Sequence, residues 1–437
     1  MERQATSRFP ILIAAIVVSS AALGLVYIGL VKPGTPSDEF SHWLNVLYYA
    51  KHHGMPKVGA PSVTQEAQQP PLAYAIAALL KGTTRTFLTL RDTFVASRLL
   101  GGVEWLLTLF FSWRILGRLL PEDVNGRVVG FAYLALSPML LAMAWSVQND
   151  TLALLLGFAA LDYALAVGRD SFSVRHGVVL GIIVAAGLLA KATVWPLLVT
   201  VPIWLLVRRH GRKPWLVTVA FAATILVVAG WWFVRNALLY GDLLGPGTAP
   251  PSLGATAATH VSFLHNLGSA VENAVTYLWL PTEYWRNFFH APGVLKALLV
   301  LLTGAIVIIG TLALVQSFGR FRMTGGGAGS LFTGQQRSGW FLVGLTGLMA
   351  FGGWLIQFVG ELQPHTLGVQ LAARLAYLAL PLWAGLVALT AGTLGRLVPR
   401  LRPVVPIVVV VVMLVLNAWV LRSIHDTHIP AGYIINL

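Results

Sequence analysis

The alternation of long apolar runs with short polar segments predicts a chain of membrane-spanning helices. Each run of roughly twenty uncharged residues is long enough to cross ~30 Å of hydrocarbon as an α-helix. The seven clearest runs are Pro10–Val31, Val128–Val147, Trp215–Val234, Ala297–Gly319, Ser338–Gly360, Leu375–Gly395 and Pro403–Leu421. Four shorter or less apolar segments are Phe94–Leu116, Thr151–Gly168, Gly177–Ala190 and Ala192–Val207. We therefore predict an all-α polytopic membrane protein with about eleven transmembrane helices.

Two further helices are predicted in the first loop, residues 32–93. Pro36 and Ser37 suit a helix start, and the apolar positions that follow recur at i, i+3, i+4, i+7 and i+8, which is typical of an amphipathic helix lying on a membrane. These positions are Phe40, Trp43, Leu44, Leu47 and Tyr48. Pro71–Leu80 is apolar but too short to span, so we interpret it as an interfacial or re-entrant helix.

Composition supports the membrane interpretation, since 57% of the 437 residues are apolar and only 11% are charged. The net charge of +14 does not indicate nucleic-acid binding, because no soluble basic domain carries it. The chain has no cysteine, so disulfides and thiolate metal sites are excluded. A bound metal would need His and carboxylate ligands.

The positions of Arg and Lys predict the orientation. With a cytoplasmic N-terminus, every predicted inner loop is basic, as the positive-inside rule requires. Counting Pro71–Leu80 as a span would place the Arg208–Lys213 loop outside and break the pattern. We interpret Pro10–Val31 as an uncleaved first span. The expected organisation is a catalytic transmembrane module (1–240), an extracytoplasmic loop (241–292) and C-terminal transmembrane helices (293–437) with no soluble C-terminal domain.

On this topology, polar residues with possible chemical roles gather on the extracytoplasmic side. Asp38 and His42 lie one helical turn apart beside Glu39. A carboxylate next to a His can act as a general base or bind a metal, although helix capping by the acids is an alternative. Glu66, Gln68 and Gln69 precede Pro70 and suit the hydroxyls of a sugar, or form a solvated loop. Asn149 and Asp150 cap an outer turn and are further candidates for sugar or acceptor binding.

Cationic residues lie at the same predicted outer helix ends. They are Arg98, Lys191, Arg235 and Arg374. Such side chains can bind a phosphate, Arg through two donors and Lys as a point charge; snorkelling to lipid headgroups is the alternative. Glu104 and Asp162 lie deeper in their spans and are interpreted as helix–helix contacts. His365 is interpreted as a solvated loop residue.

The order of these motifs resembles the GT-C superfamily of membrane glycosyltransferases, especially the protein O-mannosyltransferases and the aminoarabinose transferases of lipid A. The similar segments are Asp38–His42, Gln69–Tyr74, Arg98, Gly230–Asn236 with Tyr240–Asp242, and, more loosely, Gln370–Arg374 with Leu380–Pro381. Leu375 stands where a Tyr is often found, which weakens the match of Arg374.

The resemblance implies transfer of a sugar from a polyprenyl-phosphate donor to a glycan, lipid or protein acceptor on the extracytoplasmic face of the cell membrane. It implies Asp38 as the base and inversion at the anomeric carbon, and it leaves a divalent metal (Mg²⁺ or Mn²⁺) open. Two alternatives remain. The first is a transporter or lipid flippase, which would carry charged residues midway along its spans; Glu104 and Asp162 have such positions. The second is a noncatalytic envelope-assembly protein, which would tolerate charge-neutral changes at Asp38, Glu39 and Arg98.

Overall fold

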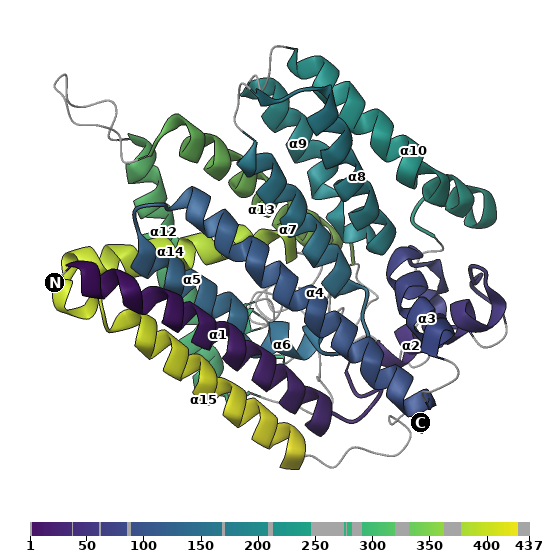
Figure 1. The fold of residues 1–437 in the computed structure, drawn as a ribbon, viewed down its shortest axis with the longest axis horizontal. Coiled ribbons are helices and arrows are strands. Elements are labelled where there is room, and N and C mark those ends of the chain that lie inside the picture. Colours follow the sequence, from purple (N-terminus) through teal and green to yellow (C-terminus); the bar gives the residue numbers. More distant parts are fainter. Residues whose placement is uncertain are drawn as a thin grey trace.

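Helices account for all the regular structure in the described part of the chain (Figure 1). The computed structural model describes residues 2–36, 38–60, 63–84, 89–167, 171–208, 213–245, 275–276, 278–281, 291–319, 332–361 and 377–426. The predicted all-helical fold class is confirmed. Most of the predicted outer loop 241–292 lies outside these residues.

Six helices are long and apolar enough to cross a membrane. They are α1 (Glu2–Leu30), α4 (Leu90–Leu119), α10 (Pro214–Tyr240), α12 (Gly293–Gly319), α14 (Leu380–Leu397) and α15 (Val405–Asp426). The remaining predicted spans correspond to α5 (Val124–Leu136) with α6 (Pro138–Ala144), α7 (Asp150–Ala166), α8 (Val174–Ala190), α9 (Pro196–Val207) and α13 (Gly334–Glu361). All eleven predicted segments are therefore helical, whereas the number that cross the membrane stays a prediction.

One predicted span is broken in two. The run Val128–Val147 forms α5 and α6, which meet at an angle of 50°. Pro138 begins α6 and has no N–H to continue α5. Asn417 of α15 donates its Nδ2 to the Leu136 carbonyl at 2.8 Å, and Tyr27 of α1 donates its hydroxyl to Asn417 Oδ1 at 3.2 Å. A polar side chain thus satisfies backbone exposed by the break, as hydrocarbon surroundings demand.

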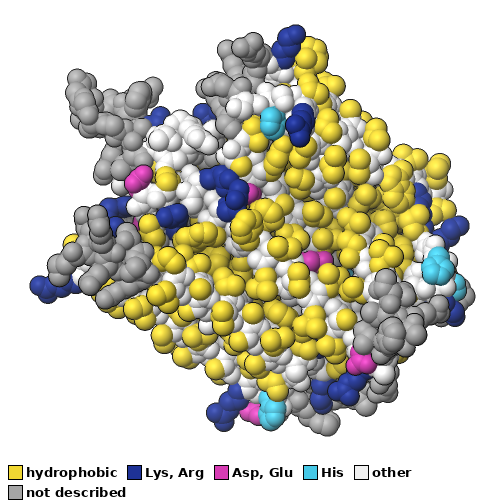
Figure 2. All heavy atoms as spheres, in the orientation of Figure 1, with side chains coloured by type: hydrophobic (Ala, Val, Ile, Leu, Met, Phe, Trp, Pro, Cys, Tyr) yellow, Lys and Arg dark blue, Asp and Glu magenta, His cyan; other side chains and the backbone are white. Residues whose placement is uncertain are grey.

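The outer surface of the helix bundle has the character of a lipid-facing surface. Figure 2 shows a broad hydrophobic band, with Lys and Arg gathered mainly toward its margins. Large apolar side chains project from the long helices, for example Val227 of α10 (80% exposed) and Leu298 of α12 (57% exposed). Because water does not tolerate so large an apolar surface on a monomer, this band faces lipid, and the protein is a membrane protein.

Glycines let two pairs of helices approach closely. A Cβ added at Gly130 of α5 would lie 2.4 Å from the Ala384 carbonyl oxygen of α14, and one at Gly177 of α8 would lie 2.4 Å from the Val217 carbonyl oxygen of α10. Each glycine belongs to a pair four residues apart, with Gly126 and Gly181 respectively. Small residues at this spacing drive helix packing in membranes.

The first loop folds into two short helices at one end of the bundle, hereafter the α2–α3 end. These are α2 (Glu39–His52) and α3 (Leu72–Thr84), joined by a region that includes the 3₁₀ helix η1 (Gln65–Gln68). The amphipathic face of α2 was expected to lie on the membrane. Instead Trp43 is buried edge-to-face against Phe94 of α4, with ring centroids 5.1 Å apart, while Phe40 is 48% exposed. The apolar face of α2 is therefore shared between protein packing and the surface.

Candidate active site

Glu39 and Arg98 form a buried clamp between the first loop and α4. Arg98 donates Nε to Glu39 Oε1 at 2.8 Å and Nη2 to Oε2 at 2.7 Å, and the two side chains are 2% and 0% exposed. Arg98 Nη1 also donates to the Val31 carbonyl at 2.8 Å, and Glu39 accepts from the backbone N–H groups of Gly34 and Val147, each at 2.9 Å. A bidentate pair with this many further bonds is a strong positioning element.

Asp38 occupies an unusual backbone conformation at the start of α2. It is the N-cap residue with φ 62° and ψ −3°, in the left-handed region, and its side chain makes no capping hydrogen bond to the helix. A non-glycine residue rarely adopts this conformation, and such strain concentrates at functional sites. The predicted face shared by Asp38 and His42 is therefore altered, because Asp38 lies outside the helix.

His42 is buried in contact with Tyr74 of α3, a residue that the sequence analysis did not select. His42 Nδ1 lies 2.7 Å from the Tyr74 hydroxyl oxygen, and the rings are stacked with centroids 5.7 Å apart. Burial lowers the pKa of His42 and raises that of Tyr74 well above its usual value. Both side chains are consequently neutral near pH 7, and the hydrogen bond between them links α2 to α3.

A second buried ion pair joins two predicted outer turns. Lys191 follows α8 and Asp150 begins α7, and Lys191 Nζ lies 2.7 Å from Asp150 Oδ1, with side chains 8% and 1% exposed. The charges of Lys191, Asp150, Asp38 and Glu66 all act on His42. Each of these four residues is therefore close enough to His42 to influence it.

The predicted amide residues lie beside this ion pair. Gln68 of η1 is 7% exposed, and Gln69 accepts a hydrogen bond at 3.4 Å from the buried Asn149 Nδ2 through its Oε1. Glu66 is half-buried, and its carbonyl accepts from Asn45 Nδ2 of α2 at 2.8 Å. The loop that carries these residues is thereby attached to both α2 and the start of α7.

A cavity of about 160 Å³ opens between η1, the turn after α8, and α10; we name it the Lys191 cavity. Its polar lining includes Gln68, Gln69, Lys191 and Thr193, and its apolar lining includes Trp232 and Leu244. The sequence analysis did not select Trp232 or Thr193. The WW pair in Gly230–Asn236 was the available signal, but membrane-interface anchoring explains a Trp equally well.

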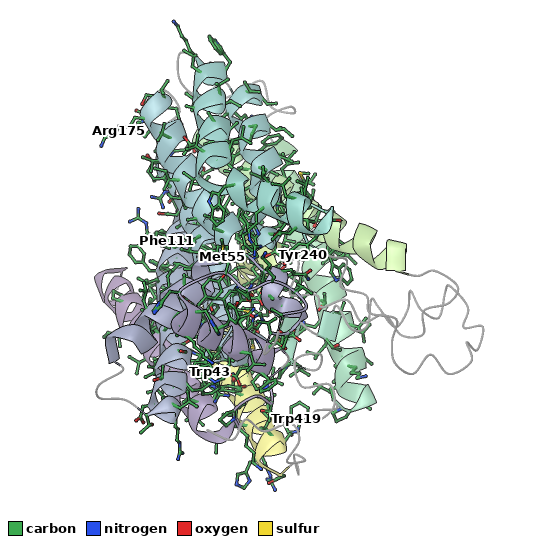
Figure 3. The ribbon with its side chains drawn as sticks, turned by 90° about the vertical axis from the view of Figure 1, so that its right-hand side faces the viewer. Trp43, Met55, Phe111, Arg175, Tyr240 and Trp419 are labelled. Carbon is green, nitrogen blue, oxygen red and sulfur yellow. The ribbon has the colours of Figure 1, made fainter. Side chains whose placement is uncertain are left out.

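Arg235 of α10 holds the first loop against the same end of the bundle. Its Nη2 donates to the Pro56 carbonyl at 2.9 Å, and its Cζ lies 4.8 Å from the centroid of the Trp232 ring. Tyr240, further along α10, accepts from the Val58 N–H at 3.1 Å. Figure 3 shows Met55 of the loop beside Tyr240, in agreement with these contacts. Arg235 makes no ion pair among the described residues.

Other predicted residues fall outside this group. Arg374 and His365 lie outside the described residues. Asp162 pairs with Arg114 Nε at 2.9 Å and with Arg118, in keeping with the helix–helix contact expected for it. Glu104 lines a second, smaller cavity of about 20 Å³ together with His42 and Tyr74.

Most of the chain matches a known protein family. The sequence pattern of a family described as "Predicted membrane protein (DUF2142)" matches residues 45–327, well over half of the chain. The chain belongs to the DUF2142 family. No match is found among curated proteins.

Solved structures similar to this DUF2142 protein are membrane glycosyltransferases. An oligosaccharyltransferase from Archaeoglobus fulgidus, crystallised with Zn and sulfate, has a TM-score of 0.53 at 14% identity, over 95% of this chain and 53% of that one. ArnT from Cupriavidus metallidurans, bound to undecaprenyl phosphate, has a TM-score of 0.38 at 16% identity, over 87% and 78%. The DUF2142 chain thus shares the fold of the oligosaccharyltransferase and spans about half of its length.

Proposed function

We propose that this protein is a membrane glycosyltransferase that moves a sugar from a polyprenyl-phosphate donor to an acceptor on the extracytoplasmic face. The observation that carries the proposal is the arrangement at the α2–α3 end. A buried Lys–Asp pair and buried amides lie at a cavity with an aromatic wall, and the strained Asp38 lies within electrostatic range of His42 at the same end. The GT-C-like fold and the relation to an oligosaccharyltransferase support the same reaction class.

Asp38 is the proposed base. Its carboxylate takes the proton of the acceptor's hydroxyl or amine while the acceptor atom forms a bond to the anomeric carbon. The bond from that carbon to the phosphate oxygen breaks, and its electron pair leaves with the phosphate. A positioned general base contributes about 10²–10⁴-fold to such a step. The left-handed backbone of Asp38 directs its side chain differently from that of Glu39, which supports separate roles for the two acids.

Arg235 is the proposed cation for the phosphate, and Lys191, whose charge Asp150 balances, donates to an oxygen beside it. Cationic groups fixed where negative charge develops lower the barrier without reorganising during the step. Arg98 fits a positioning role better, because Glu39 and the backbone carbonyls already take its donors. Glu39 and His42 likewise hold the first loop in place through Arg98 and Tyr74. Arg374 stays a candidate phosphate ligand from the sequence alone.

The proposal routes no step through a metal. The described residues contain no group of three or more His, Asp or Glu side chains placed to hold one. Glu39 is committed to Arg98, and Asp150 is paired with Lys191. The described residues therefore form no metal centre by themselves, and the proposed chemistry rests on the side chains named above.

The test is donor consumption by the purified protein in nanodiscs, using a panel of polyprenyl-phosphate sugars with candidate glycan, lipid and peptide acceptors. We expect one donor to be consumed, and Asp38→Asn to reduce the rate by at least about 10²-fold while the protein stays folded. Asp426→Asn, at the exposed end of α15, is the matched control and keeps full activity. Full activity of Asp38→Asn would contradict the role of Asp38, and consumption of no donor would contradict the proposed reaction.

A further inference from the structure

The Lys191 cavity has a buried acceptor atom that lacks a donor. Gln68 is 7% exposed, and its Oε1 has no hydrogen-bond partner among the described residues. By contrast, Gln69 Oε1 accepts from Asn149. Buried polar atoms in folded proteins are nearly always satisfied. The carbonyl of Gln68, on the lining of the cavity, therefore calls for a ligand that brings a hydrogen-bond donor.

The charges around the Lys191 cavity balance, which indicates that its ligand is neutral. Lys191 is the cation in its lining, and Asp150 neutralises it at 2.7 Å. An ammonium group has three donors, so Lys191 can donate to an oxygen of the ligand while its ion pair with Asp150 stays in place. The ligand therefore needs a hydrogen-bond donor for Gln68 and an acceptor for Lys191, without net charge. The hydroxyls of a neutral sugar provide both.

The size of the cavity limits the number of rings. A cavity of about 150 Å³ holds one benzene molecule, and the Lys191 cavity measures about 160 Å³. Trp232 and Phe233 form its apolar wall, and aromatic side chains offer a large rigid contact area to a flat ring. The space therefore matches one six-membered ring.

We propose that the Lys191 cavity binds the sugar of the donor, that this sugar is a single neutral ring, and that Gln68 selects it. In this arrangement Gln68 Oε1 accepts from a ring hydroxyl and Lys191 donates to an oxygen at the side nearer the phosphate. The inference rests on the proposed function and deepens it, because it names a monosaccharide donor and the residue that reads its hydroxyl.

The experiment compares kcat/KM for the donor that the protein consumes, for its singly deoxygenated analogues, and for a polyprenyl-phosphate disaccharide. We expect the unaltered protein to discriminate about tenfold or more against one deoxy analogue and against the disaccharide. A site built around a substrate hydroxyl rejects the analogue that lacks it. Gln68→Leu should remove the discrimination against that deoxy analogue, bringing the ratio near one, and Gln68→Glu, which keeps the acceptor oxygens, should retain it.

Gln335→Leu is the matched control. Gln335 is exposed near the start of α13 and donates to Leu165 at the opposite end of α7 from Asp150, so the ratio should not change. An equal loss for all donors in Gln68→Leu would mean that Gln68 only supports the loop, and efficient use of the disaccharide would overturn the single-ring assignment. Consumption of no donor at all would overturn the proposed function, and this inference with it.

Discussion

The neighbouring acids Asp38 and Glu39 have different surroundings. Glu39 enters the protein and is fully enclosed by Arg98 and two backbone N–H groups. Asp38 keeps a left-handed backbone at the helix start and is only partly buried. The sequence placed both in the candidate site, but residue type and spacing do not predict which of the two carboxylates is enclosed by the protein.

The clamp leads to a prediction about stability. Arg98→Met leaves the Glu39 carboxylate buried without its partner, and breaking such a pair costs about 3–5 kcal/mol. We expect a loss of unfolding free energy of that size, measured by denaturant unfolding in detergent. Arg422→Met removes one partner of the exposed Arg422–Asp426 pair, whose side chains are 84% and 59% exposed, and should have a much smaller effect because exposed ion pairs contribute little. Equal stabilities of the two variants would show that the clamp does not hold the fold.

At the scale of elements, close helix contacts position the turns that carry the site. The glycine pairs of α5 and α8 lie against backbone carbonyls of α14 and α10. Lys191 lies at the end of α8 and Trp232 lies on α10, so the contact between these helices positions both residues. The spacing of the glycines was visible in the sequence, but their partners were not, because packing partners are chosen by the whole bundle.

Gly130 provides the test of this packing. The methyl group of Gly130→Ala would meet the Ala384 carbonyl oxygen at 2.4 Å, so α5 and α14 must separate. Overpacking of this kind costs about 1–3 kcal/mol, which thermal unfolding in detergent can measure. Gly344→Ala in α13 is the matched control, since nothing lies within 4 Å of the added Cβ, and helix propensity favours Ala there by up to about 1 kcal/mol. A neutral or stabilising effect of Gly130→Ala would contradict the contact.

At the scale of the whole molecule, α4 runs from the α2–α3 end, where it carries Arg98, to the end where Arg114 and Arg118 pair with Asp162. The distribution of Arg and Lys predicts that the α2–α3 end faces outward. The proposed function requires that orientation, because the acceptor is met on that side.

The absence of cysteine makes the orientation directly testable. Lys57→Cys in the first loop and Glu122→Cys in the turn before α5 replace exposed residues at the two ends. In intact cells a membrane-impermeant maleimide should label Lys57→Cys and not Glu122→Cys, and both should react after permeabilisation. The unaltered protein is the control, since it has no thiol. The reverse labelling pattern would invert the topology and move the candidate site to the cytoplasmic side.

The sequence by itself determined the class of the fold and the positions of its helices. Uncharged runs of membrane length can form few structures other than helices, because a chain in hydrocarbon must satisfy its backbone hydrogen bonds internally. The same pattern selected the short helices of the first loop and most residues now found at the α2–α3 end. The bend at Pro138 was missed because Pro within an apolar run need not end a span.

The tertiary structure alone decided which polar residues are partners. It paired Arg98 with Glu39 and Lys191 with Asp150, brought Tyr74 to His42, and formed the Lys191 cavity between three segments distant in sequence. Charge and hydrogen bonding act over a few ångströms in space, whereas the sequence records only order along the chain. The same Arg or Glu can therefore bind a ligand or close a buried pair, and only the packing of the helices separates the two.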